Sequence, residues 1–405
     1  MTRIIIIGGG PAGTFAALAA KKQNPDAGVV LLTEEPCEPY EKPPLSKGVL
    51  VGKVRAADAP IAGPGGLAAH GVALECGARC RTIDRTSHTL TLEDGRRMTY
   101  GALVMATGAV VRELPHLPAG MPRVHYLRTE ADAQYLTSTL AGTRRLLVVG
   151  AGLIGLEVAA SAAELGVPTT VLELAPRILA RVCHEEISSL VESAHRSRGV
   201  DLRLGCAVAS VAEGDKTIEV VTTNEDRLAA DAIVVGTGAK PNDRLAADIG
   251  LAVDEGIVVD EYCRTSDPAI FAAGDVTRFP GPHGPVRLEN WRHALDQGAV
   301  AGRNAAGGRD AYRTIPSFWS EQYDLYIQGV GWPAAEAQRV NRPLPGNAAL
   351  TFDVRDGRLV GAMGINVQKD LAAARRLIER QVPVDPAALA DPSQPLAAML
   401  KRATG

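Results

Sequence analysis

Two glycine clusters are the residues whose types and spacing point most directly to chemistry. The first cluster contains Gly8, Gly10 and Gly13, and the second contains Gly150, Gly152 and Gly155, with Ile154 inside it. In a G-x-G-x-x-G pattern the first glycine permits a tight turn, the second lets the backbone approach a pyrophosphate, and the third lets a helix pack closely on a strand. The N–H groups that begin the following helix then bind the phosphates. Each cluster therefore predicts a dinucleotide-binding module.

The segments around each cluster have the patterns needed to position it. Residues 2–7 (TRIIII) form an apolar, β-branched run typical of a buried strand, a helix-like stretch follows the first cluster, and residues 28–33 predict the next strand. The order recurs with residues 146–149 (LLVV), the second cluster, a helix-like stretch and residues 169–173 (TTVLE). The chain thus contains an internal repeat of a βαβ unit.

An acidic residue at the end of the second strand of each unit is expected to bind a ribose hydroxyl. In the first unit this acid is Glu34, with Glu35 as the alternative, and in the second it is Glu173. A carboxylate at Glu173 repels a 2′-phosphate and favours NADH, although Arg177 and Arg181 leave NADPH open because an arginine binds such a phosphate. Two dinucleotide sites in one chain indicate FAD in the first and NADH in the second.

Further strands complete the predicted architecture. Residues 102–108 (ALVMATG) and 232–238 (AIVVGTG) return the chain to each sheet, and Ile270–Asp275 predicts another buried strand that ends in an acid. Aromatic residues after about 315 and alternation in 348–363 predict an antiparallel sheet. We expect an α/β fold with two Rossmann-like, glutathione-reductase-like nucleotide-binding domains and a C-terminal α+β domain. The predicted boundaries are 1–112 with 243–314 for FAD, 113–242 for NAD, and 315–405 for the C-terminal domain.

Composition excludes several classes of protein. The formal net charge is −3 and no block of Lys and Arg stands out, so we expect neither nucleic-acid nor membrane binding. The apolar runs are too short to cross a bilayer, and the N-terminus lacks the features of a signal peptide. The 6 cysteines are scattered without a C-x-x-C pattern, which indicates reduced thiols. We therefore expect a cytoplasmic protein.

Several segments together resemble one family. Pro39–Lys47 (PYEKPPLSK) resembles a segment of the FAD-dependent ferredoxin–NAD(+) reductases of bacterial oxygenase systems, the family of putidaredoxin reductase, rubredoxin reductase and biphenyl dioxygenase ferredoxin reductase. Ile270–Asp275 is similar to the second FAD motif of that family, Leu288–Trp291 to its flavin-edge segment, and Pro316–Gln328 to the start of its C-terminal domain. The resemblance covers nearly the whole chain in the right order.

The resemblance implies roles for individual residues. FAD would be lined by Glu34, Lys42, Lys47 and the backbone of Cys80, with Ala106, Gly108 and Arg128 near the pyrophosphate and flavin, Asp275 on the ribityl chain, and Trp291 and Trp319 beside the isoalloxazine. Glu157 would lie near the nicotinamide and pair with Lys47 where the two rings meet. We also expect Gly238 and Arg181 to contact cofactor. One departure is Lys42, which stands where the family usually has arginine and replaces a bidentate contact with a point charge.

The expected activity is transfer of a hydride from NADH to FAD, followed by release of single electrons to a small [2Fe–2S] ferredoxin, or a rubredoxin, that feeds a Rieske or haem-thiolate oxygenase. We expect a monomer or a weak homodimer. Three alternatives remain: a disulfide reductase, for which no suitably spaced cysteine pair is present; an NADH oxidase or peroxidase that uses Cys37; and a flavoprotein of the apoptosis-inducing-factor kind, whose main role is partner binding.

Overall fold

The computed structural model describes residues 3–332, 334 and 336–402, and the chain divides into two compact units. The first unit comprises Met1–Lys42, Val54–Val110 and Ala239–Thr314, and the second comprises Pro43–Lys53, Val111–Gly238 and Ile315–Gly405. The second unit therefore contains the segments predicted to bind NAD and to form the C-terminal domain, together with part of the PYEKPPLSK segment. The division into three domains with the boundaries given above stays a prediction.

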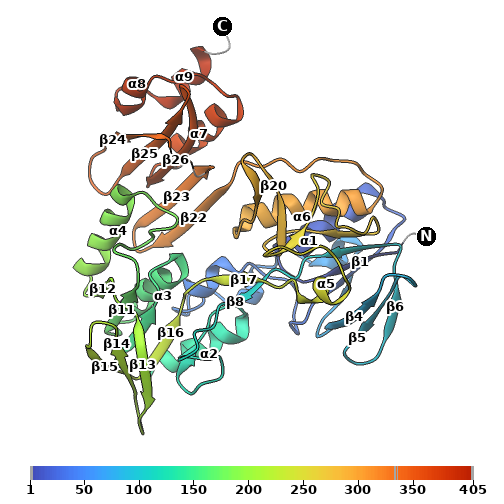
Figure 1. Cartoon of the computed structure of the whole chain (residues 1–405), viewed down its shortest axis with the longest axis horizontal. Coiled ribbons are helices and arrows are strands. Elements are labelled where there is room, and N and C mark those ends of the chain that lie inside the picture. The colour runs from blue at the N-terminus through green and yellow to red at the C-terminus, as the bar shows by residue number, and fades with distance from the viewer. Residues whose placement is uncertain (1–2, 333, 335, 403–405) are drawn as a thin grey trace. The chain divides into compact units, whose positions relative to one another are not determined.

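A parallel sheet, buried except at its edge strand β3, forms the centre of the first unit (Figure 1). Its order is β19-β7-β1-β2-β3, with bounds Ile270–Ala272, Ala102–Met105, Arg3–Ile7, Gly28–Leu32 and Ala73–Glu75. In register, Ile5 on β1 lies between Val30 on β2 and Leu103 on β7. The isoleucine run is buried because both of its faces are covered, as parallel sheets require.

Two helices of the first unit pack unusually closely. Helix α1 (Pro11–Gln23) and helix α6 (Trp291–Ala305) lie side by side (Figure 1). A Cβ on Gly298 of α6 would collide with the backbone of Ala12, so only glycine permits this approach. The remaining elements of this unit are η2 (Ala56–Asp58), η3 (Leu67–His70), β4 (Cys80–Asp84), β5 (Thr89–Leu92), β6 (Arg97–Thr99), β17 (Ala239–Pro241), α5 (Arg244–Asp248), β18 (Ile257–Val258), β20 (Thr277–Gly281) and β21 (Gly284–Val286), while β8 (Ala109–Val111) ends at its boundary.

The second unit repeats the parallel sheet, with order β12-β11-β10-β16-β9. Strand β9 (Val124–His125) takes the edge place that β19 occupies in the first sheet, although it precedes β10 in the chain. The other elements of this part are η1 (Pro43–Ser46), α2 (Glu130–Leu140), β10 (Leu146–Val149), α3 (Leu153–Glu164), β11 (Thr169–Glu173), α4 (Glu185–Ser197), β12 (Asp201–Leu204), β13 (Val208–Glu213), β14 (Ile218–Thr222), β15 (Arg227–Ala230) and β16 (Ala232–Val235). The predicted internal repeat is confirmed.

The C-terminal part of the second unit is an antiparallel sheet with order β22-β23-β26-β25-β24, against which α7 packs (Figure 1). Its elements are β22 (Ser317–Gln322), β23 (Leu325–Gly331), β24 (Gln338–Arg342), β25 (Ala349–Arg355), β26 (Arg358–Ile365), α7 (Gln368–Glu379), α8 (Pro386–Ala390) and α9 (Leu396–Arg402). The predicted fold class is confirmed. Among the described residues, no helix has both the length and the apolar character to cross a membrane.

A buried polar contact joins α4 to the C-terminal sheet. His184, the residue before α4, contacts Thr351 through Nδ1 at 2.7 Å and Asp353 through Nε2 at 3.0 Å. Arg339 also contacts Asp353, at 3.1 Å. Burial by itself raises the pKa of Asp353, but the interactions with His184 and Arg339 outweigh it and hold the pKa below its ordinary value of 3.8.

Asp353→Asn should lower the free energy of unfolding at pH 7 by about 2 kcal/mol, because His184 and Arg339 both lose a charged hydrogen-bond partner. Since the pKa of Asp353 is depressed by folding, its stabilisation is present above pH 3.8 and is lost as the pH falls below that value. Urea unfolding of both proteins at pH 7 and near pH 3 measures this. A difference between the two proteins that does not shrink in acid would contradict the account.

Candidate active site

The first glycine cluster forms the tight turn between β1 and α1. Gly8 has φ +118°, and a Cβ there would collide with the carbonyl oxygen of Ala106. A Cβ on Gly13 would collide with the carbonyl oxygen of Gly8. Around a Cβ on Gly10, in contrast, no atom of the described residues lies within 4 Å. Two glycines are thus required by packing, and the middle one leaves open space at the helix start.

The second cluster has the same construction between β10 and α3. Gly150 has φ +103°, and a Cβ on Gly155 would collide with the carbonyl oxygen of Gly150. For a Cβ on Gly152 the nearest atom of the described residues, the oxygen of Gly236, lies 4.0 Å away. Ile154, in the first turn of α3, is 46% exposed although it is a large apolar residue. The second turn also leaves its middle glycine accessible.

The two helices that follow the clusters begin differently from their neighbours. Helix α2 starts with a side-chain cap from Thr129 and has acidic residues in its first turn, and α4 also has acids there. The N-cap residues of helices α1 and α3 are Gly10 and Gly152, no side chain in the described part of the chain caps either helix, and their first turns contain no acid. Their first N–H groups and the positive end of the helix dipole are therefore available to phosphates, which fits a bound dinucleotide.

The structure distinguishes the two acids after β2. Glu34 is exposed and pairs loosely with Arg79 at 3.4 Å. Glu35 instead contacts Lys42 at 2.8 Å and accepts a hydrogen bond from Tyr40. Glu34 is thus the acid that the structure leaves on the surface beside the first cluster, and the charge of Lys42 is directed to Glu35.

Glu173 is tied to the second glycine turn. Its carboxylate accepts hydrogen bonds from the backbone N–H of Ala151 at 2.7 Å and of Ala175 at 2.8 Å. Arg177 donates to the carbonyls of Cys183 and Ala180, so its guanidinium is engaged by its own loop.

Arg181 is exposed, and a Cβ on Gly238 would lie 3.6 Å from its guanidinium. The two arginines that leave NADPH open therefore differ. The guanidinium of Arg177 is bonded to its own loop, whereas, among the described residues, that of Arg181 is not and lies near Gly238 of the second dinucleotide module.

Glu157 is the centre of a buried polar cluster in the second unit. It lies on α3 and is 3% exposed. Lys47 Nζ lies 3.0 Å from its Oε2, the Ser320 hydroxyl donates to Oε1 at 2.6 Å, and the Ser46 hydroxyl also donates to Oε2. Ser161, one turn after Glu157 on α3, also fixes the segment by donating to the carbonyl of Ser46 at 2.8 Å. The structure thus brings Lys47 and Glu157 together, as the family resemblance implied.

The remaining predicted residues are distributed over both units. Cys80, Ala106, Gly108, Asp275 and Trp291 belong to the first unit, and Arg128, Gly238 and Trp319 belong to the second.

Their local surroundings shorten one predicted strand and add one contact. The strand predicted over Ile270–Asp275 ends at Ala272, and Asp275 lies in a turn that leads into β20. Trp291 starts α6 and donates through Nε1 to Glu41 at 2.6 Å.

Four of the cysteines, Cys76, Cys80, Cys183 and Cys263, are poorly suited to thiol chemistry. Burial raises the pKa of Cys80 and Cys183 to about 12 and raises that of Cys263 further, so these thiols stay protonated at neutral pH. Burial and the nearby acids Glu38 and Glu75 also raise the pKa of Cys76. A disulfide reductase needs a reactive thiolate, which these residues do not provide.

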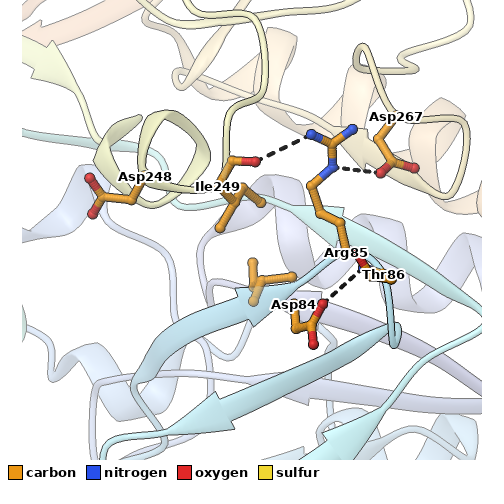
Figure 2. Close-up of a pocket in the computed structure, with 7 residues that line it drawn as sticks. Asp84, Arg85, Thr86, Asp248, Ile249 and Asp267 are labelled. Carbon is orange, nitrogen blue, oxygen red and sulfur yellow. Dashed lines mark hydrogen bonds and ion pairs between the residues drawn. The ribbon is translucent and has the colours of Figure 1, made fainter.

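A hollow of about 660 Å³ elsewhere in the first unit does not suit a nucleotide phosphate. Figure 2 shows Arg85 turned toward Asp267, at 2.7 Å, and toward the carbonyl of Ile249, at 3.2 Å. Asp84 and Asp248 also line the hollow. Since the guanidinium is already engaged and three carboxylates surround the space, an anion would be repelled.

Comparison with known proteins decides the family. A model described as pyridine nucleotide-disulphide oxidoreductase matches residues 2–298, and one described as reductase C-terminal matches residues 317–400. The chain is 39% identical to rhodocoxin reductase of Rhodococcus erythropolis, over 96% of this chain and 92% of that protein. It is also 39% identical to the ferredoxin–NAD(+) reductase component of the anthranilate 1,2-dioxygenase system of Burkholderia cepacia, over 96% and 97%. The chain belongs to the ferredoxin–NAD(+) reductases.

The solved structures agree with this assignment. The reductase in the covalent putidaredoxin reductase–putidaredoxin complex matches with a TM-score of 0.94 and 32% identity, over 100% of this chain and 99% of that chain. As a member of the ferredoxin–NAD(+) reductases, the chain is an oxidoreductase that uses FAD and NADH, and the two open glycine turns fit these cofactors.

Sequence reasoning missed part of the polar cluster of this reductase. Ser46 lies within Pro39–Lys47 and Ser320 within Pro316–Gln328, two segments that resemble the family, but neither serine was given a role. Side chains alternate along β22, so Ser320 lies on the face opposite Trp319. This alternation is the feature of the sequence that could have predicted an inward-facing Ser320.

Proposed function

We propose that this reductase oxidises NADH and passes electrons one at a time to a small [2Fe–2S] ferredoxin, which supplies a Rieske or haem-thiolate oxygenase. The observation that carries the proposal is the full-length match to reductase components of such systems. The bound flavin supplies the ability to accept a hydride and to release single electrons. The residues of the chain bind the two cofactors, orient them and provide charge near the reacting atoms.

We assign the first glycine turn and Glu34 to FAD, since the turn has open space and an uncapped helix start and Glu34 lies exposed beside it. The further FAD contacts in the proposal are Lys42, Cys80, Ala106, Gly108, Arg128, Asp275, Trp291 and Trp319. Each of these roles rests on the family resemblance, and binding of FAD to single variants tests them.

We assign Lys47 and Glu157 to the place of hydride transfer. Lys47 supplies a positive charge that stabilises negative charge developing on the reacting ring. Glu157 holds Lys47 at 3.0 Å, and the serines on either side fix the carboxylate. The role of the pair is therefore orientation and electrostatics, and no side chain in this proposal acts as a nucleophile.

We assign the second glycine turn, Gly238 and Arg181 to NADH, with Glu173 as the residue that selects it. Glu173→Gln should lower the ratio of kcat/KM for NADH to that for NADPH by about tenfold, because the negative charge that repels a 2′-phosphate is lost. Steady-state kinetics with both nucleotides measure the ratio. Glutamine keeps an acceptor for one of the two backbone N–H groups, and a ratio unchanged within about twofold in this variant would show that Glu173 does not discriminate.

We place a ferredoxin ahead of a rubredoxin as the acceptor, and we propose a monomer or weak homodimer in the cytoplasm. Under anaerobic conditions with NADH, the rate of reduction of a [2Fe–2S] ferredoxin should exceed that of a rubredoxin at equal concentration. Reduction of rubredoxin alone, or turnover only with oxygen or peroxide, would contradict the proposal. Sedimentation velocity tests the oligomeric state.

A further inference from the structure

The buried cluster around Glu157 continues through the protein as a chain of hydrogen bonds. Gln322 Nε2 donates to the Ser320 hydroxyl oxygen at 3.1 Å, and His195 Nε2 contacts Gln322 Oε1 at 2.9 Å. The Tyr323 hydroxyl contacts His195 Nδ1 at 3.1 Å. All of these residues belong to the second unit. Together with the bond from Ser320 to Glu157, the chain runs from a surface turn to the proposed site of hydride transfer.

The chemistry of the groups fixes the direction of every bond. An amide oxygen only accepts, so His195 Nε2 carries the proton and donates to Gln322. Burial, together with the charge of Arg198, lowers the pKa of His195 despite the hydrogen bond to Gln322, so the ring is neutral at pH 7 and its Nδ1 accepts from Tyr323. Each donor therefore points toward the Glu157 carboxylate, and such aligned hydrogen bonds strengthen one another.

The positions of these polar residues are otherwise suited to apolar side chains. His195 is 0% exposed and shares one stripe of α4 with Ile187 and Val191 at a spacing of four. Gln322 and Ser320 are 1% and 0% exposed. Burying such groups lowers stability unless their hydrogen bonds are satisfied, and apolar residues would fill the same space without that cost.

Tyr323, the first residue of this series of hydrogen bonds, lies in a strained turn. Tyr323 has φ +57°, the left-handed region that residues other than glycine rarely adopt. The guanidinium of Arg198 lies 4.3 Å from the centre of its ring and also pairs with Asp324 at 2.6 Å. These contacts hold the Tyr323 hydroxyl on His195.

We infer that His195 and Gln322 are positioning residues for Glu157, which act by orienting the Ser320 hydroxyl. Because the oxygen of Ser320 accepts from Gln322, its O–H is directed at Glu157, and the carboxylate is held between this serine and the Ser46–Lys47 segment. This inference rests on the role proposed above for Glu157 in hydride transfer.

The test uses the FAD-loaded protein with His195→Leu and Gln322→Leu, and His184→Leu as the matched control. His184 is buried at the other end of α4, and its contacts with Thr351 and Asp353 do not lead to Glu157. We expect the two chain variants to lower the limiting rate of flavin reduction by NADH about tenfold and to change the dissociation constant of NAD+ by less than about twofold. His184→Leu, the control, should lower the melting temperature but leave the rate of flavin reduction unchanged. His195→Gln keeps a donor toward Gln322 and should therefore retain most of the wild-type rate.

A second readout does not depend on activity. In the wild-type protein, ¹⁵N NMR should show His195 protonated at Nε2 and unprotonated at Nδ1, and Gln322→Leu should remove this single tautomer. Equal rate losses in His195→Leu and His184→Leu, or a proton on Nδ1 in the wild type, would overturn the inference. If Glu157→Gln also leaves the rate unchanged, the proposed role of Glu157 fails as well; if that variant is slow while the chain variants are not, the inference alone fails. Should His195→Leu not fold, Gln322→Leu carries the same test.

Discussion

Gly10→Ala should yield a folded protein that has largely lost its FAD. No atom of the described chain lies within 4 Å of the added methyl group, and φ of Gly10 is −83°, so the folded chain accommodates alanine without strain. The methyl group would instead occupy space that the proposal assigns to the pyrophosphate. A clash of this kind costs about 2 kcal/mol, which corresponds to a loss of affinity of roughly thirtyfold.

The measurement is the dissociation constant of FAD, by fluorescence titration of apoprotein, together with circular dichroism. Gly28→Ala is the matched control, because Gly28 also has open space around it but starts β2 away from the turn. Unchanged FAD affinity in Gly10→Ala would remove the first glycine turn from the site. Loss of secondary structure in this variant would show instead that Gly10 is needed for packing.

Glu157→Gln should slow the reduction of the bound flavin by NADH about a hundredfold, because Lys47 loses its charged partner and moves from its position. The folded state should survive, since glutamine keeps one oxygen to accept from Ser46 or Ser320. Lys47→Met should have an effect of similar size, because it removes the charge itself.

The measurement is the limiting rate in anaerobic stopped-flow absorbance at saturating NADH. The pair Lys53 and Glu164 provides the matched control, since it also joins the 43–53 segment to α3, at 2.5 Å, but is exposed. Glu164→Gln should leave the rate unchanged. A similar loss of rate in Glu157→Gln and Glu164→Gln would indicate that the variants only loosen the segment.

Much of the fold could be predicted because it rests on local patterns. The isoleucine run of β1 and the glycines that follow it have few other compatible structures, so the two βαβ units and the repeat were evident in the sequence. Strand β9 was not predicted, because two residues, Val124 and His125, are too few to show a period. The turn at Asp275 was also missed, since the apolar run that starts at Ile270 continues past Ala272, where the strand ends.

The site was predicted less completely, because side-chain partners depend on tertiary contacts. The pairing of Lys47 with Glu157 was expected from the family resemblance, but Ser46 and Ser320 on the same carboxylate were not. His195 and Gln322 meet across 127 positions of sequence, and no spacing rule connects them. Likewise, the sequence could not show that Lys42 forms its ion pair with Glu35 rather than with Glu34.

The central claim is that NADH delivers electrons through the bound flavin to a ferredoxin, and one anaerobic stopped-flow experiment tests it most directly. The yellow protein is mixed first with NADH or NADPH and then with an oxidised [2Fe–2S] ferredoxin. We predict fast bleaching of the flavin with NADH, slow bleaching with NADPH, and prompt reduction of the ferredoxin. Fast bleaching followed by reaction only with oxygen or peroxide, with no transfer to a ferredoxin, would contradict the account.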